Sequence, residues 1–211
     1  MPVLWAFLLG TALVAGVTFA LLRGSRAPAA IQHPAAPLTA IATWPAGTRR
    51  APSFRLTDQH GAPVSLASLR GRTAIITFID PVCRNLCPLE AKVLTVAARR
   101  LPAGDRPAIV SVSVNPWANT AANFRQDATH WQLGPGWRWA IGTEAQLTAV
   151  WRRYGIGVRF VKKVVTGIAV RSIVHTEGSY VVDRNGFERA LFLYPFTASD
   201  VEQTLRRLAT T

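Results

Sequence analysis

The chain has 211 residues, 49% of them hydrophobic, and its 24 Lys and Arg outnumber its 11 Asp and Glu to give a net charge of +13. The basic residues are mostly arginines scattered along the chain, and no basic stripe interleaved with aromatic residues appears, so the composition argues against nucleic-acid binding. The charge instead favours attraction to acidic lipids or to an acidic partner protein.

The first segment of the chain is apolar. From Pro2 to Leu22 no side chain carries a charge, and the run is long enough to cross a bilayer as a helix. Trp5 lies near one end, where an aromatic side chain anchors at the membrane interface. A cleaved signal peptide is the alternative, but the run is longer than a usual signal core and no strong A-x-A site follows it. We therefore predict a transmembrane helix, which gives a membrane anchor over residues 1–23.

Residues 24–51 are rich in Ala and Pro, a composition typical of an extended spacer rather than a folded element. The globular domain is therefore expected to start at residue 52 and to cover residues 52–211. That length is sufficient for one domain with a sizeable hydrophobic interior.

Beyond the spacer, apolar runs with strand periodicity alternate with helical patterns. The expected strands are the hairpin Phe54–Leu66 and the runs Ile75–Ile79, Ala108–Val114, Trp137–Ile141, Ser179–Val182 and Phe187–Leu193. The expected helices are Leu86–Arg100, Asn119–Trp131, a helix capped by Thr143 that continues to Tyr154, and Thr197–Leu208. Between the last two strands, Asn185-Gly186 is a hairpin signal because Asn-Gly supplies positive φ angles. This order predicts an α/β fold, a thioredoxin-like sandwich in which helices flank a central mixed sheet.

The only two cysteines, Cys83 and Cys87, follow the strand Ile75–Ile79 and an Asp80-Pro81 turn signal. Their four-residue spacing predicts both sulfurs on one side of the first turn of the next helix. Backbone N–H groups and the positive end of the helix would point at these sulfurs and favour thiolate. A structural disulfide is the alternative, but it would close a very small loop and constrain the unfolded chain little.

Several short motifs occur in a specific order from Pro52 to Leu208. They are the Phe54 hairpin with Leu69-Arg70-Gly71, the Cys-x3-Cys-Pro corner, Val110-Ser111-Val112-Ser113-Val114-Asn115-Pro116, Gly134-Pro135-Gly136-Trp137, Tyr154-Gly155-Ile156, and His175 ahead of Tyr180-Val181-Val182-Asp183. In this ordered set the chain resembles the Sco/SenC family. The resemblance implies a membrane-tethered, thioredoxin-like copper protein that helps to assemble the dinuclear copper centre of cytochrome c oxidase.

The resemblance further implies that Cys83, Cys87 and His175 are copper ligands, and that the two cysteines form a redox-active dithiol. Two thiolates and one imidazole are a soft donor set suited to Cu(I), and they can hold Cu(II) with a water or a further ligand. Structural zinc wants four protein ligands, and the sequence offers no obvious fourth. The implied partners are the copper-bearing subunit of cytochrome c oxidase, a thiol–disulfide reductant, and the membrane through the N-terminal helix.

A dithiol that cycles with its disulfide suits an oxidising compartment, so we expect a single-pass protein of the cell membrane with its soluble domain on the extracytoplasmic side. Arg23 and Arg26 directly after the apolar segment would favour the opposite orientation by charge alone. The expectation therefore rests on the chemistry of the cysteines.

The chain departs from the family pattern at three places. The interval between the cysteines is Arg84-Asn85-Leu86, without the acidic residue that members often have, and Asn115-Pro116 stands where many members read Asp-Pro. Val158–Ser172 carries four basic residues close to His175 in the sequence. These differences bear on the identity of the partner more than on metal binding. Two acidic residues lie near the ligands in the sequence. Asp80 is interpreted as a turn former or as a group that orients a ligand. Glu177 is interpreted as a residue that contacts the ligands.

The competing interpretation is a thiol–disulfide oxidoreductase that acts on the cysteines of an exported copper-acceptor protein. Two features argue against it. The spacing is Cys-x3-Cys, whereas thioredoxin-type motifs have Cys-x2-Cys. The stretch His175–Tyr180 also lacks the proline that faces the dithiol in thioredoxin-like oxidoreductases. A non-catalytic redox or copper sensor is a third possibility.

Overall fold

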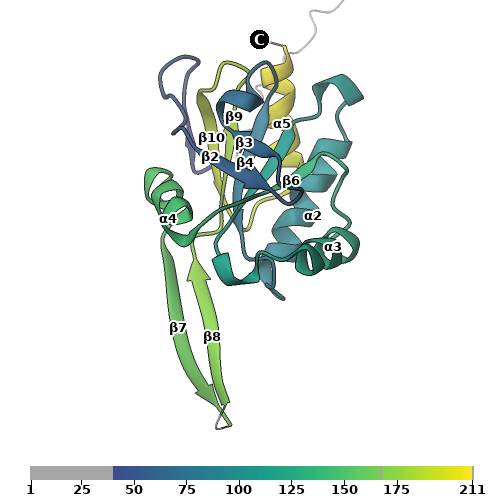
Figure 1. Ribbon diagram of the computed structural model, residues 1–211. Coiled ribbons are helices and arrows are strands. Elements are labelled where there is room, and N and C mark those ends of the chain that lie inside the picture. Colours follow the sequence, from purple (N-terminus) through teal and green to yellow (C-terminus); the bar gives the residue numbers. More distant parts are fainter. Residues whose placement is uncertain (1–39, 167, 211) are drawn as a thin grey trace, which may run out of the picture. The chain divides into compact units, whose positions relative to one another are not determined.

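The computed structural model describes residues 40–166 and 168–210 (Figure 1). Its strands are β1 (Ala42–Thr43), β2 (Arg55–Asp58), β3 (Pro63–Ser65), β4 (Ala74–Ile79), β5 (Ala108–Ser113), β6 (Trp137–Ile141), β7 (Val158–Val165), β8 (Ile168–His175), β9 (Gly178–Val182) and β10 (Glu188–Leu193). Its α-helices are α2 (Leu86–Arg99), α3 (Ala121–His130), α4 (Glu144–Arg153) and α5 (Ala198–Ala209), and η1 (Ala67–Leu69), η2 (Ala103–Asp105) and η3 (Pro116–Ala118) are short 3-10 helices. This mixed α/β architecture agrees with the fold class predicted from the sequence.

Eight of the strands form one sheet in the order β1-β10-β9-β4-β5-β6-β2-β3. The neighbouring strands β4, β5 and β6 run parallel, so their carboxyl ends lie at the same edge of the sheet. Strand β9 runs antiparallel beside β4, with Thr77 opposite Ser179, which brings its amino end to that edge too. The cysteine corner follows β4 and His175 precedes β9, so the topology alone brings them to one edge.

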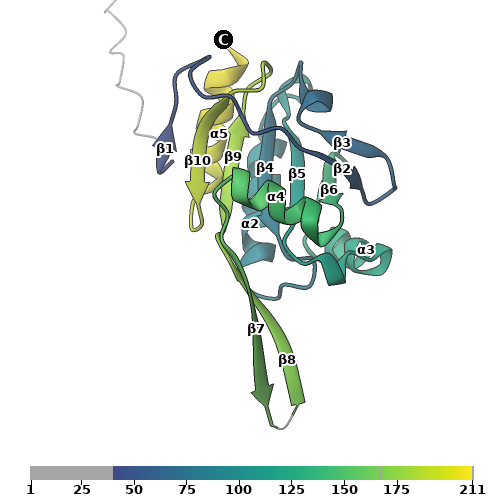
Figure 2. The same cartoon turned by 60° about the vertical axis from the view of Figure 1, so that its left-hand side comes forward.

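Helices cover both faces of this sheet (Figure 2). On one face α2, α3 and α5 pack over β4 side chains such as Ile75 and Ile79. On the other face α4 packs over the alternate residues Ile76 and Phe78. Every residue of β4 is buried, as expected for a central strand that is covered on both faces.

The helix caps confirm the local sequence signals, and one turn departs from them. Thr143 and Thr197 both form capping boxes at the first turns of α4 and α5. In the turn between β9 and β10, Gly186 has a φ of 83°, but Asn185 is not among the described residues with positive φ. Asp183 explains the difference, because its carboxylate accepts from the N–H groups of Asn185 and Phe187 and fixes a different turn.

The stretch before residue 52 is partly folded, contrary to the spacer prediction. Strand β1 pairs antiparallel with β10 at the edge of the sheet, and Ala51 is buried. Arg49 donates to the buried Glu188, which fastens this stretch to β10. Residues 40–51 are therefore part of the domain, because tertiary pairing overrides a Pro-rich composition that predicts extended chain. The remainder of the predicted spacer lies outside the described residues.

The predicted anchor over residues 1–23 also lies outside the described residues. Among the residues that are described, no helix has the combination of length and apolar character that crossing a membrane requires.

Strands β7 and β8 form a long antiparallel hairpin that runs beyond the ends of the sheet strands (Figures 1 and 2). The ring of Phe160 packs on Trp117, with 4.6 Å between the ring centroids, and also faces Trp151. The sequence analysis treats this stretch as a basic segment and misses both strands, although its β-branched and aromatic residues are typical of strands. His175 is the last residue of β8, so the hairpin brings the predicted ligand back to the sheet.

Candidate metal centre

The cysteine corner connects the end of β4 to the start of α2. The Asp80 carboxylate accepts from the N–H of Val82 at 3.1 Å and from the Asn115 amide at 3.0 Å, so Asp80 fixes the turn and ties it to the loop after β5. Helix α2 begins at Leu86, as predicted, so Cys83 lies just before the helix and Cys87 lies in its first turn. The Cys87 N–H donates to the Cys83 sulfur at 3.4 Å, so that sulfur caps the positive end of the helix.

The two thiols differ in acidity. A hydrogen bond from the Cys87 thiol, with backbone N–H groups of Asn85 and Cys87, lowers the pKa of Cys83 to about 6 although burial opposes the shift. The same thiol–thiol bond and burial raise the pKa of Cys87 far above its ordinary value. The described cysteines are free, Cys87 being fully buried and Cys83 half-buried. Cys83 is therefore the more acidic thiol of the pair.

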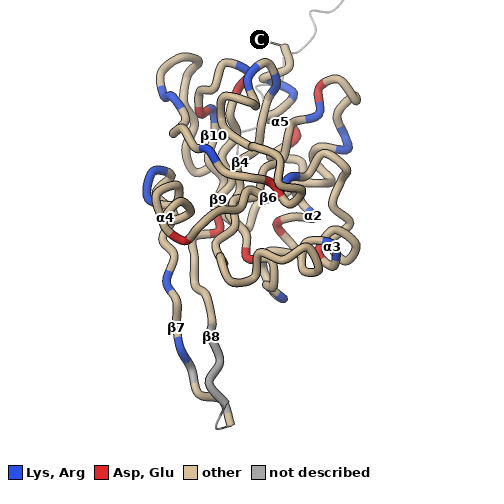
Figure 3. The backbone as a smooth tube through the Cα atoms, in the orientation of Figure 1, with Lys and Arg blue, Asp and Glu red and all other residues tan. Residues whose placement is uncertain are grey.

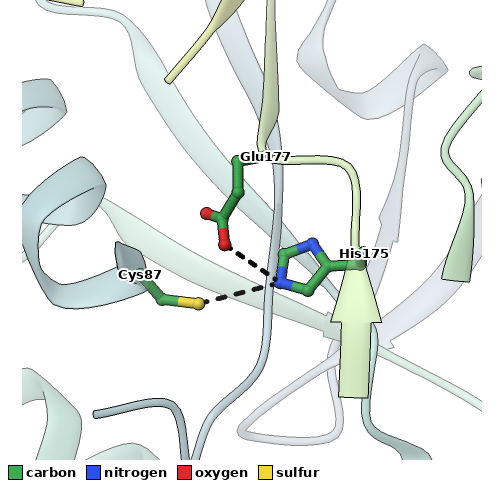
Figure 4. A group of neighbouring side chains, drawn as sticks. All are labelled: Cys87, His175 and Glu177. Carbon is green, nitrogen blue, oxygen red and sulfur yellow. Dashed lines mark hydrogen bonds and ion pairs between the residues drawn. The ribbon is translucent and has the colours of Figure 1, made fainter. Parts of the chain in front are cut away.

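His175 meets Cys87 across the corner, although the two residues are 88 positions apart. Its Nε2 lies 3.8 Å from the Cys87 sulfur, and its Nδ1 lies 3.1 Å from the carbonyl oxygen of Thr176 (Figure 4). Since a carbonyl only accepts, Nδ1 carries the proton and Nε2 presents a lone pair to Cys87. Burial lowers the pKa of His175, which favours the neutral imidazole that metals bind.

A buried pair of carboxyl groups lies behind these residues. Glu177 Oε1 is 3.5 Å from His175 Nε2. Burial, followed by the neighbouring Glu90, raises the pKa of Glu177 to about 8. Glu90 is completely buried, and its Oε1 accepts from the hydroxyls of Thr77 at 2.8 Å and Ser179 at 2.6 Å. The sequence analysis does not consider Glu90, although its place one helical turn after Cys87 is the signal that could have identified it.

Ligand atoms of Cys87, His175 and Glu177 all lie within 4.8 Å of one another (Figure 4). Cys83 does not belong to this group of donors but adjoins it through the Cys87 N–H. A cavity of about 500 Å³ opens beside Cys83 and is lined by Asn115, Trp117 and other residues of the corner. The structure thus brings the three predicted residues to one place and adds a carboxylate to them.

The family of the chain follows from its sequence as a whole. The SCO1/SenC family model matches residues 44–210, which is most of the chain and almost all of its described part. The chain belongs to the SCO1/SenC family. Among curated protein sequences, none matches it.

Solved structures of this family share the thioredoxin-like fold at low sequence identity. ScoI of Bradyrhizobium japonicum, solved with copper bound, is 24% identical, with a TM-score of 0.62 over 75% of this chain and 99% of that one. Yeast Sco1, also solved with copper bound, is 16% identical, with a TM-score of 0.66 over 77% of this chain and 90% of that one. BsSco is 22% identical, with a TM-score of 0.60 and coverages of 77% and 94%. Its structure describes a disulfide switch in a member of the Sco family of cytochrome c oxidase assembly proteins.

Proposed function

We propose that this Sco/SenC chain is a copper metallochaperone that holds copper through Cys83, Cys87 and His175 and delivers it to the dinuclear copper centre of cytochrome c oxidase. The observation that carries the proposal is the 3.8 Å approach of Cys87 Sγ to His175 Nε2. A buried thiol and a neutral imidazole from distant parts of the chain converge beside a thiol of low pKa. The relatives that are solved with copper bound support copper as the cargo.

The chemistry of the residues fits copper. Thiolate sulfur is a soft donor that selects Cu(I), and imidazole nitrogen binds either oxidation state of copper. Cys83 is already a thiolate near neutral pH, while Cys87 must release its proton when metal binds. The carbonyl of Thr176 holds the imidazole in the tautomer that leaves Nε2 free. The chain itself therefore supplies the donors, the orientation of the ring and a largely buried environment.

The partners and the location are parts of the same proposal. The copper-bearing subunit of the oxidase is the acceptor, and a thiol–disulfide reductant keeps the dithiol reduced. The membership of BsSco in a family of cytochrome c oxidase assembly proteins supports this acceptor. The uncharged run Pro2–Leu22 supports a single-pass membrane anchor, and the redox-active thiols support an extracytoplasmic domain.

A second candidate function is disulfide reduction of the copper acceptor, and the unequal acidity of the two thiols favours it. The Cys83 thiolate attacks one sulfur of a substrate disulfide, forms a mixed disulfide and releases the other sulfur as thiolate. After losing its proton, Cys87 attacks the Cys83 sulfur, which releases the reduced substrate and leaves a Cys83–Cys87 disulfide. An external thiol reductant then restores the dithiol.

The variant His175→Ala separates the two functions. It removes the imidazole and leaves both thiols and the start of α2 in place, so dithiol exchange should proceed at nearly the wild-type rate. Copper binding should weaken, most of all for Cu(II), because imidazole is among its preferred donors. The measurements are copper stoichiometry, the visible thiolate-to-Cu(II) absorption, and a disulfide exchange assay on the same preparations.

His60→Ala is the matched control, since His60 is an exposed histidine in the turn between β2 and β3. It should bind copper and exchange disulfides as the wild type does. If His175→Ala retains the copper stoichiometry and spectrum of the wild type, the ligand assignment fails and disulfide reduction becomes the better proposal.

A further inference from the structure

Glu177 turns toward the same point as Cys87 and His175. Its side chain is only 16% exposed, and its Oε1 lies 3.5 Å from His175 Nε2 (Figure 4). Its Oε2 is buried, and the neighbour that its carboxyl group meets there is the carboxyl group of Glu90. Two buried carboxyl groups in contact cannot both be charged without a proton or a cation beside them, so this pair can bind either.

The side of the imidazole on which Glu177 lies distinguishes a ligand from a supporting residue. Carboxylates that only orient a metal-binding histidine accept from the nitrogen that does not bind the metal. In this site that nitrogen is Nδ1, and the carbonyl of Thr176 already occupies it. Glu177 instead faces Nε2, the nitrogen that also faces Cys87. The carboxylate and the free lone pair of the ring therefore point at one shared position.

The groups that surround this position are acidic. The groups that act on the Glu177 carboxyl are Glu90, Cys83 and Asp80, all of them acidic. Within residues 40–166 and 168–210, the ion pairs include none between Lys or Arg and either Glu90 or Glu177. A chain with a net charge of +13 has basic side chains in excess, so the lack of such an ion pair among the described residues is a local property of this site. The site accordingly favours a metal cation.

We propose that Glu177 is a metal ligand, whose carboxylate joins Cys83, Cys87 and His175 as a fourth protein donor. This inference rests on the proposed copper function and adds a donor to it. Two thiolates and an imidazole alone suit Cu(I), whereas a carboxylate oxygen is a harder donor that favours Cu(II). The same four donors also match the sulfur, nitrogen and oxygen set of tetrahedral Zn(II) sites, which the sequence analysis set aside for want of a fourth ligand.

The test compares Glu177→Gln and Glu177→Ala with the wild type in the full-length chain, reduced and without oxygen. Cu(II) should bind about 10-fold or more weakly to both variants, while the dissociation constant for Cu(I) should change by about twofold or less. The electron paramagnetic resonance spectrum of bound Cu(II) should also change, since an oxygen donor is lost. Co(II) provides a probe that does not oxidise thiols, and its visible bands should shift and weaken in the variants.

Glu144→Gln is the matched control because Glu144 is an exposed carboxylate in the first turn of α4. It should leave every one of these measurements unchanged. Glu177→Asp keeps the carboxylate on a side chain that is shorter by one methylene group. Its affinity for Cu(II) should fall between those of the wild type and Glu177→Ala. This variant carries the test if the other two do not fold.

The outcomes separate the two proposals. If the variants bind Cu(II) as tightly as the wild type, with the same spectrum, Glu177 is not a ligand and the three-ligand copper site stands. If the wild-type chain itself binds no copper, the proposed function fails, and the additional ligand fails with it.

Discussion

Buried acidic groups at the two ends of strands β4 and β9 have different kinds of partner. At the end where β9 turns into β10, the buried Glu188 accepts from Arg49, and Asp183 lies 3.4 Å from Arg189. At the other end, the buried Glu90 accepts from two hydroxyls and is hydrogen-bonded to Glu177, which also faces a histidine. Figure 3 shows blue and red segments next to one another toward the end of the domain that carries the C-terminus.

This difference distinguishes acidic residues that serve the fold from acidic residues that belong to the metal centre. An acidic group paired with arginine has its charge balanced within the fold, so it needs no ligand to balance it. An acidic group that is buried beside other acids must hold a proton or bind a cation. The metal centre of this chain is therefore recognised by the compensation that it lacks, as well as by the residue types that it contains.

The largest expected effect concerns the unequal ionisation of Cys83 and Cys87, at the end of strand β4 that carries the metal centre. In the metal-free, reduced protein, Cys83 should react with iodoacetamide at a rate that rises through about pH 6, following its lowered pKa. Cys87 should react about 100-fold or more slowly at neutral pH, because its raised pKa keeps it protonated. Peptide mapping by mass spectrometry measures both rates, and equal rates would contradict the unequal sharing of charge. Bound copper should protect both thiols.

Arg49→Met tests the other end, where arginine compensates a buried acid. The substitution leaves Glu188 buried without a cation and removes the contact of the guanidinium with the Trp44 ring. Because Arg49 is half exposed, we expect a loss of about 2 kcal/mol in the free energy of unfolding, below the usual cost of breaking a fully buried pair. Urea unfolding at pH 7 measures it.

Arg50→Met is the control for that loss. Arg50 stacks on the Phe187 ring in the same way but takes part in no ion pair within the described part of the chain. It should cost less than about 1 kcal/mol, which is typical of an exposed cation–π contact. Equal losses for the two variants would mean that Glu188 does not depend on its cation.

The sequence predicts the paired cysteines and most of the strands far better than it predicts the acidic residues of the metal site. Strand β6 and the capping threonine of α4 follow from local signals, since a strand period or a cap depends on neighbouring residues in the sequence. Strand β1 depends on β10 for its hydrogen bonds, so a Pro-rich composition conceals it. Hairpin β7–β8 has a composition typical of strands, but the sequence analysis considers only its basic residues and therefore misses it.

The site shows the same limit. Cys83, Cys87 and His175 are found from residue type and from the resemblance to a family. The role of Glu177 depends on its burial, on Glu90 next to it and on the lack of an ion pair with Lys or Arg among the described residues, and all three are tertiary properties. The lesson is that donors which form a motif can be predicted, whereas donors selected by their surroundings require the structure.

Thr77→Val tests whether a hydroxyl group stabilises the buried Glu90, as Arg49 stabilises Glu188 at the other end. Valine has nearly the same shape but cannot donate to Glu90, so the variant should lose about 1.5 kcal/mol of unfolding free energy. Adding Glu90→Gln should reduce that loss, because a neutral amide depends less on the hydroxyl than a carboxyl group does. Thr57→Val, which removes an exposed hydroxyl on β2, should change stability by less than about 0.5 kcal/mol. A loss at Thr77 that equals the loss at Thr57 would contradict the role of the hydroxyl.

The smallest expected effect concerns Asp127 on α3, an acid with only a distant cation. Arg84 lies 3.9 Å away, and burial raises the pKa of Asp127 to about 7. The folded state therefore retains a proton that the unfolded state releases near pH 4, so this group lowers stability as the pH rises from about 4 to 7. Asp127→Asn should be more stable than the wild type by about 0.5 kcal/mol at pH 8 and equally stable near pH 4. Thermal unfolding at both pH values, with the exposed Asp105→Asn as control, measures this difference, and a gain that is independent of pH would show that Asp127 is compensated like the acids at the opposite end.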